Sequence, residues 1–87
     1  MSTRGVLGTS GDGLVHGAFF LDRANVLGYI KRLLEKEAFP VFTACSGYLE
    51  LRGFHVVRGV NDLRSITCLS CMLAGYRWVE NVGDFVT

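Results

Sequence analysis

Residues 22–37 read DRANVLGYIKRLLEKE, and this stretch carries the clearest structural pattern in the chain. Its aliphatic residues recur at steps of three and four, which places them on one face of a helix. They are Val26, Leu27, Ile30, Leu33 and Leu34, and the charged side chains Lys31, Arg32, Glu35 and Lys36 fall on the other side. Asp22 can accept hydrogen bonds from the first free backbone amides, and Pro40 stops the helix from continuing. We predict an amphipathic helix over residues 23–37.

The residues before this helix predict a strand. Residues 14–21 form an apolar run with a turn signal before it and Asp22 after it, which is typical of a buried strand. The turn signal is the run Ser10-Gly11-Asp12-Gly13. Residues 1–13 are then either a flexible glycine-rich arm or an extra strand. Residues 14–87 are expected to form a single α+β domain.

The residues after the helix predict a hairpin, with strands over residues 41–45 and 48–60 and a turn at Ser46-Gly47. In the second strand, successive side chains should alternate between two faces. The face expected to meet the core carries Leu49, Leu51, Gly53, His55 and Val57, and the opposite face carries Tyr48, Glu50, Arg52, Phe54 and Val56.

The last third of the chain predicts a second helix and a final strand. Asn61 or Asp62 caps a helix that carries Leu63 and Leu73 and ends at Gly75. Residues 65–73 also fit a strand with a period of two, so both alternatives stay open. Residues 76–82 are predicted to be the final strand.

The expected order is therefore strand, helix, strand, strand, helix, strand. Right-handed crossovers return each helix to the same side of a sheet, so a four-stranded antiparallel sheet with two helices on one face buries this pattern simply. This is a ferredoxin-like βαββαβ sandwich of the α+β class. The alternative joins residues 3–20 as a hairpin, followed by one helix and a strand meander, as in roadblock- or longin-like adaptor folds.

The composition excludes several classes of function. Nine Lys and Arg against eight Asp and Glu give a net charge of +1, so bulk charge does not point to nucleic acid, a membrane or an acidic substrate. The longest uncharged stretch is shorter than the roughly 20 apolar residues that span a bilayer, and we expect neither a transmembrane helix nor a signal peptide. Three cysteines cannot all pair within one chain. We therefore expect an intracellular, reducing compartment, either cytoplasm or nucleus.

Residues 52–59 read RGFHVVRG, which resembles the third-strand signature of the RNA recognition motif (RRM). Arg52, Gly53, Phe54 and Val57 match that signature, whereas His55, Val56 and Gly59 depart from it. Residues 14–19 stand where the family has its first-strand motif, with Val15 in place of a stacking aromatic residue. The resemblance extends over residues 14–86 in the order of the elements.

This resemblance implies that Phe54 stacks on a base and that Arg52 contacts a phosphate or a base. It also implies that stacking has been lost at Val15 and Val56. Each missing aromatic platform removes about 1–3 kcal/mol of affinity for RNA. Degenerate domains of this kind commonly bind a protein instead. The resemblance therefore favours a protein partner over RNA.

Two of the three cysteines form a short motif, Cys68-x-x-Cys71, which is typical of a zinc site or a redox site. A zinc site needs two more ligands from Cys45, His16 and His55, and no second paired motif is present. A redox site wants its first cysteine at the start of a helix, whereas this pair lies in an apolar stretch. The pattern favours buried structural cysteines, with no metal and no cofactor.

The same residues allow a catalytic pair of Cys45 with His16 or His55, although no orienting carboxylate is suggested. The apolar and aromatic face of residues 48–56 is instead the stronger signal, because such a face marks a binding surface unless the N-terminal arm covers it. We predict a non-catalytic binding module that uses this open sheet face, with no small-molecule substrate. A protein partner or self-association comes first, RNA second and a small cysteine-dependent enzyme third. The expected contact residues are Tyr48, Arg52, Phe54, Val56, Arg58 and Val15.

Overall fold

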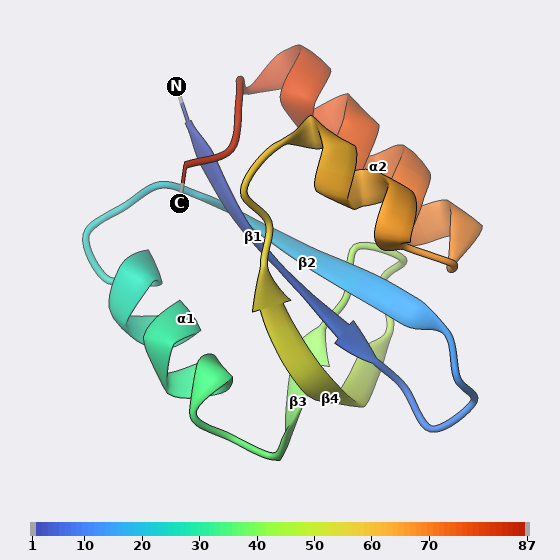
Figure 1. Cartoon of the computed structure of the whole chain (residues 1–87). Helices are drawn as coiled ribbons and strands as arrows, with labels where there is room; N and C mark the ends of the chain where they lie inside the picture. Colours follow the sequence, from blue (N-terminus) through green and yellow to red (C-terminus); the bar gives the residue numbers. More distant parts are fainter. Residues whose placement is uncertain (1, 87) are drawn as a thin grey trace.

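The computed structural model describes residues 2–86 as an α+β fold with one four-stranded antiparallel sheet (Figure 1). Its elements are β1 (Thr3–Thr9), β2 (Val15–Leu21), α1 (Val26–Leu34), β3 (Ala38–Phe42), β4 (Tyr48–Val56), the 3-10 helix η1 (Val60–Ser65) and α2 (Leu69–Asn81). The strands lie in the order β2-β1-β4-β3. Within the described residues, neither helix has the length and hydrophobicity to cross a membrane.

The N-terminal residues form a hairpin. Strand β1 pairs with β2 from Thr3 opposite Leu21 to Thr9 opposite Val15. The connecting turn is closed by the Gly13 amide, which donates to the Ser10 carbonyl at 3.0 Å, and Gly13 has a positive φ of 86°. The extra-strand alternative is therefore correct for Thr3–Thr9, and the flexible arm is wrong for these residues. Strand β1 is a central strand, because β4 pairs with its other edge.

Helix α1 confirms the amphipathic prediction with shorter bounds than residues 23–37. Its two buried side chains are Ile30 and Leu33, spaced by three residues as the pattern requires. The strand after it runs over Ala38–Phe42 rather than residues 41–45, and Pro40 lies within it. A proline is tolerated there because β3 is an edge strand, which leaves one side of its backbone without a partner.

A β-bulge interrupts the regular alternation in β4. Leu7 pairs with His55 and Thr9 with Arg52, so β4 holds one more residue than β1 over this interval. Gly53 has a positive φ of 64°, which a glycine adopts without strain. The extra residue reverses the two faces, so Phe54 is buried and His55 is exposed. The predictions that Phe54 lies on an open face and that His55 points into the core are both wrong.

The C-terminal region also differs from the prediction. Residues 60–65 form a 3-10 helix and Leu69–Asn81 form α2, so the predicted strand over residues 76–82 is wrong. Gly75 does not end a helix but lies inside α2, where the helix comes close to its neighbours. A Cβ atom at Gly75 would lie 2.8 Å from Leu63 Cδ2 and 2.9 Å from Phe19 Cζ. The glycine therefore serves close packing rather than helix termination.

The two helices lie on opposite faces of the β1–β2 hairpin (Figure 1). Val6 packs with Leu33 of α1, whereas Leu7, the next residue of β1, packs with Cys71 of α2. The prediction of two helices on one face is wrong, and the βαββαβ order is not observed. The difference arises because the first two strands pair directly as a hairpin and residues 76–81 belong to α2, so within the described residues no helix connects two parallel strands of the sheet.

Replacement of Gly75 with alanine is expected to lower the free energy of unfolding by about 1–3 kcal/mol, because the new methyl group overpacks the contact with Phe19 and Leu63. Gly28 in α1 is the matched control, since a Cβ there meets nothing within 4 Å. Gly28→Ala is expected to raise the stability by up to about 1 kcal/mol through helix propensity. Urea denaturation of both variants checks this, and equal stabilisation would contradict the close packing at Gly75.

Candidate functional site

The predicted contact residues do not share one surface. Tyr48 is exposed, and its ring centroid lies 4.5 Å from that of Phe42, its partner across the β3–β4 hairpin. Phe54 packs in the core with Val6 and Leu51. Val15, Val56 and Arg58 line a groove between β1, β4 and η1. The structure thus keeps Tyr48 on an open sheet face and removes Phe54 from it.

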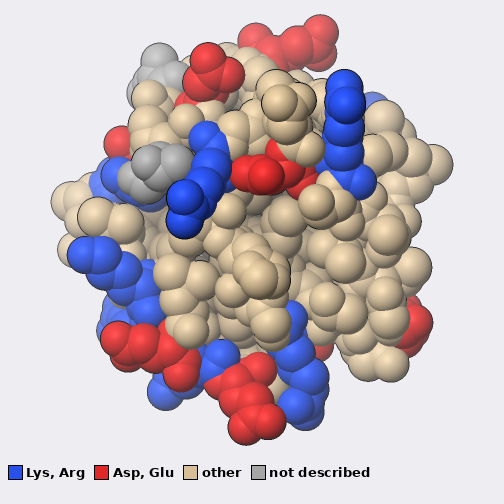
Figure 2. Space-filling model, in the orientation of Figure 1, with Lys and Arg blue, Asp and Glu red and all other residues tan. Residues whose placement is uncertain are grey.

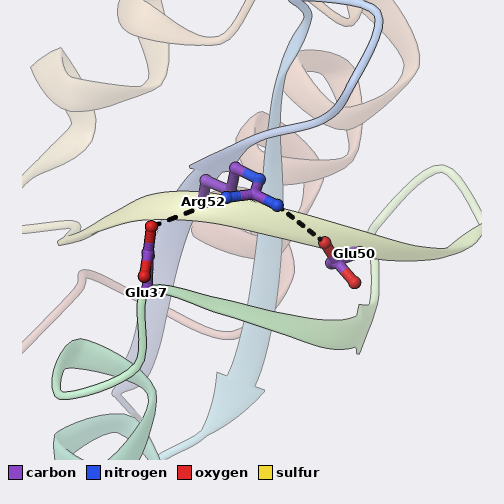
Figure 3. A network of polar contacts seen from close by, with 3 residues as sticks. All are labelled: Glu37, Glu50 and Arg52. Atoms are coloured by element: carbon purple, nitrogen blue, oxygen red, sulfur yellow. Dashed lines mark hydrogen bonds and ion pairs between the residues drawn. The ribbon is translucent and has the colours of Figure 1, made fainter.

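Arg52 is exposed but is paired with two carboxylates (Figure 3). Its guanidinium lies 3.3 Å from Glu50, two residues away on the same strand, and 3.9 Å from Glu37 in the segment before β3. Ion pairs this exposed contribute little to stability. They do place two negative charges beside the guanidinium, which disfavours a phosphate contact at Arg52.

Three uncharged segments, residues 13–21, 38–49 and 65–76, hold most of the exposed large hydrophobic residues. Six of the nine large hydrophobic residues that are exposed belong to them: Leu14, Phe42, Tyr48, Leu69, Leu73 and Tyr76. Figure 2 shows few charged side chains on the right half of the molecule, in the region where Figure 1 places the first turns of α2. Charged side chains gather instead at the left, top and bottom of that view. This distribution is typical of a binding surface.

The same three segments bring together an imidazole and three thiols. His16 comes from β2, Cys45 from the turn between β3 and β4, and Cys68 and Cys71 from the start of α2. The four potential ligand atoms all lie within 4.8 Å of one another. His16 Nδ1 lies 3.7 Å from the Sγ of Cys45 and 3.6 Å from the Sγ of Cys71. We call these four residues the thiol–imidazole cluster.

Backbone hydrogen bonds hold the segments of the cluster against the outer edge of β2. The Ala44 amide donates to the Gly17 carbonyl at 2.7 Å, and the Cys68 amide donates to the Val15 carbonyl at 3.1 Å. The hairpin turn is tightened by the Thr43 hydroxyl, which donates to the Gly47 carbonyl at 3.1 Å. The thiols therefore stand on fixed backbone rather than on a loose loop.

The other ring nitrogen of His16 is held by a polar chain. Nε2 lies 3.1 Å from the Ser10 hydroxyl, which in turn donates to the Asp12 carboxylate. A hydroxyl that donates to a carboxylate can accept from Nε2–H, so we assign the proton to Nε2 and the lone pair to Nδ1. The same hydrogen bond from Ser10, followed by that from the Leu14 amide, lowers the pKa of Asp12 from its usual value. Nδ1 therefore faces the thiols as an acceptor or ligand.

The thiols differ in their environment. Cys71 is fully buried, and that burial raises its pKa to about 12. Cys45 is half-buried; burial acts to raise its pKa, but side-chain hydrogen bonds, of which that with the Thr43 hydroxyl is the largest, outweigh it and lower the pKa to about 6. The expectation of buried cysteines is thus correct for Cys71 alone, since Cys45 and Cys68 are only half-buried.

The sequence contains every member of the cluster but does not show that they converge. The Cys68-x-x-Cys71 motif is visible in it, and Cys45, His16 and His55 are the remaining candidate ligands, but the pattern predicts a motif deep in an apolar stretch. Cys68 is instead the N-cap residue immediately before α2, with Cys71 in the first turn of that helix. The structure leaves His55 outside the cluster. Three signals together were available: two cysteines in one motif, a third in a hairpin turn and a histidine in an uncharged strand.

The fold and the cluster define a small α+β protein with a partly buried thiol–imidazole cluster beside an apolar surface. Comparisons of the chain with protein-family models, with curated proteins and with solved structures find no match. The resemblance to the RNA recognition motif therefore stays a prediction.

Proposed function

We propose that this protein is a non-catalytic protein-interaction module that binds a second copy of itself through one face of α2. That face, which we call the α2 stripe, consists of Leu69, Leu73 and Tyr76. Their side chains are 61%, 47% and 38% exposed, and this exposure is the observation that carries the proposal. Positions i, i+4 and i+7 lie on one side of a helix, and an apolar line of this kind suits packing against another helix.

The sheet edges support a contact through side chains rather than through added strands. Pro40 lies in the edge strand β3 and cannot donate a backbone hydrogen bond. At the other edge, the carbonyls of Val15 and Gly17 in β2 already accept from the amides of Thr67 and Ala44. Pairing of two sheets edge to edge is therefore disfavoured.

The charges favour an antiparallel pair of α2 helices. Glu80 continues the α2 stripe one turn beyond Tyr76, so a parallel pair would bring the two Glu80 carboxylates together. An antiparallel pair sets Leu73 opposite Tyr76 and Glu80 opposite Leu69, so no like charges meet. Residues 65–76 carry no charge at all, which removes charge repulsion from the centre of the contact. A second copy of this chain thus fits the stripe.

The arrangement of residues 3–56 supports one of the two fold assignments. A hairpin, a single helix and a second hairpin follow one another, and the roadblock- or longin-like alternative has a hairpin, one helix and a strand meander in the same order. We propose this adaptor-like arrangement in place of the ferredoxin-like one. An adaptor role agrees with a binding module that has no catalytic step.

Light scattering after gel filtration, over a series of protein concentrations, tests the proposal. The wild-type chain should reach twice its chain mass of 9.6 kDa at high concentration. Leu73→Glu should remain monomeric throughout, because a buried unpaired carboxylate is costly at an apolar contact. Leu27→Glu is the matched control, since Leu27 is 39% exposed on α1 and lies outside the stripe, and this variant should still dimerise.

Three outcomes would overturn the proposal. One is a monomeric wild-type chain at every concentration. A second is a dimer that Phe42→Ser dissociates and Leu73→Glu does not, which would move the contact to the Phe42–Tyr48 pair. The third comes from an anisotropy titration with mixed single-stranded RNA at two salt concentrations. A monomer whose salt-sensitive RNA binding is lost in Tyr48→Ala would support the RNA-binding alternative instead.

A further inference from the structure

The distances within the thiol–imidazole cluster match those of a tetrahedral metal site. Zinc binds thiolate sulfur at about 2.3 Å and imidazole nitrogen at about 2.0 Å, so a tetrahedral site separates nitrogen from sulfur by roughly 3.5–3.6 Å. His16 Nδ1 lies 3.7 Å from Cys45 Sγ and 3.6 Å from Cys71 Sγ. Cys68 completes the set within the common limit of 4.8 Å. The ligand atoms therefore need to move little to surround one ion.

We propose that His16, Cys45, Cys68 and Cys71 bind a single Zn²⁺ as a structural Cys₃His centre. This proposal replaces the sequence-based expectation of no metal. Three sulfur donors and one imidazole select zinc over magnesium or calcium, which prefer oxygen ligands. Four protein ligands also fill a tetrahedral site completely, which leaves no open position for a substrate or for water. The centre is therefore structural rather than catalytic.

The surroundings of His16 meet the usual requirement for a metal-binding histidine. Such a histidine donates its second ring N–H to a polar group, which fixes the tautomer and the orientation of the ring. Here Nε2 faces the Ser10 hydroxyl at 3.1 Å, and that hydroxyl is held by the Asp12 carboxylate. Ser10 is thus a positioning residue for the ligand. Ser10 comes from the turn of the first hairpin, so this turn orients the imidazole of the metal ligand His16.

The placement of the ligands explains what zinc would do for the fold. It would join β2, the turn between β3 and β4, and the first turn of α2, which meet at one edge of the sheet. Cys45 and Cys71 lie 29 and 55 residues from His16 along the chain. Cys45 and Cys68 are half-buried, which leaves a path by which the ion can enter.

Two other functions of the cluster, a redox dithiol and a nucleophilic cysteine, would each need only two of its four residues. A redox dithiol would need only Cys68 and Cys71, and a nucleophilic cysteine would need only Cys45 and His16. Neither use explains why a third thiol lies within the same 4.8 Å. A zinc centre uses all four groups.

The test starts from the full chain, purified under reducing conditions and supplied with ZnCl₂. We expect one zinc per chain by elemental analysis and by native mass spectrometry. With CoCl₂ in place of zinc, we expect the intense visible bands of tetrahedral Co²⁺ and the near-ultraviolet band of thiolate ligation. His16→Gln should weaken zinc binding at least tenfold, and Ser10→Ala should weaken it by about 10- to 100-fold. His55→Gln is the matched control, because His55 lies outside the cluster, and it should bind as the wild type does.

The outcomes separate the alternatives without the replacement of any cysteine. Failure of the reduced wild-type chain to bind stoichiometric zinc would overturn the proposal. So would zinc binding that His16→Gln leaves unchanged, or a cobalt spectrum without thiolate bands. Rapid alkylation of Cys45 by iodoacetamide in the presence of bound zinc would point to a free nucleophile and would also overturn it. Protection of all three thiols by zinc, with their exposure after chelation, would support it.

Discussion

Replacement of Phe54 with alanine is expected to lower the free energy of unfolding by about 3–5 kcal/mol. The side chain is only 9% exposed and packs with Val6, Leu51 and their neighbours between the sheet and α1. Loss of the ring removes its buried apolar area and leaves a cavity that the surrounding strands cannot fill completely. A loss of this size is a large part of the stability of a small domain, which is typically 5–15 kcal/mol in total.

Phe42→Ala is the matched control for this experiment. Phe42 is 73% exposed on β3, so its replacement should change the stability by no more than about 0.5 kcal/mol. Urea denaturation monitored by circular dichroism gives both values. Regular alternation in β4 predicts the opposite of this result, with Phe54 on the surface and nearly neutral. A small effect at Phe54 would therefore contradict the bulge at Gly53 as well as the burial.

Removal of zinc is expected to have the second large effect, and it rests on the proposed Cys₃His centre. A ligand that binds only the folded state stabilises it by about 4 kcal/mol when its free concentration is a thousand times the dissociation constant. The cluster joins three segments that are distant in sequence, so the stability gained from zinc is shared by β2, the β3–β4 hairpin and α2. A strong chelator should therefore lower the melting temperature markedly, and added zinc should restore it.

The His16→Gln variant separates this effect from general effects of the chelator. It should melt at a lower temperature than the wild type, and neither chelator nor zinc should shift that temperature much. His55→Gln should respond as the wild type does. If the melting temperature of the zinc-treated wild type is the same with and without chelator, zinc does not contribute to the stability of this fold.

Local patterns predicted the elements that depend on short stretches of chain. The amphipathic spacing of residues 26–34 identified α1, and the Ser10–Gly13 turn identified the possible first hairpin. The secondary structure of the uncharged residues 65–76 is harder to predict, because apolar residues at regular spacing suit a buried helix and a strand equally well. Gly75 then favoured a helix end, whereas its true role depends on Phe19, a residue far away in the sequence.

The candidate site likewise depends partly on local sequence patterns and partly on contacts between distant residues. The sequence by itself determined the ligand types, the Cys68-x-x-Cys71 spacing, the uncharged segments and the helix that covers one face of the sheet. Only the tertiary structure decided which residues face inward in β4, because the bulge there arises from pairing with β1. It alone also decided that His16 meets thiols 29 and 55 residues away. The physical reason is that hydrophobic spacing and turn propensity act over a few residues, whereas strand register and the meeting of distant segments are set by packing of the whole chain.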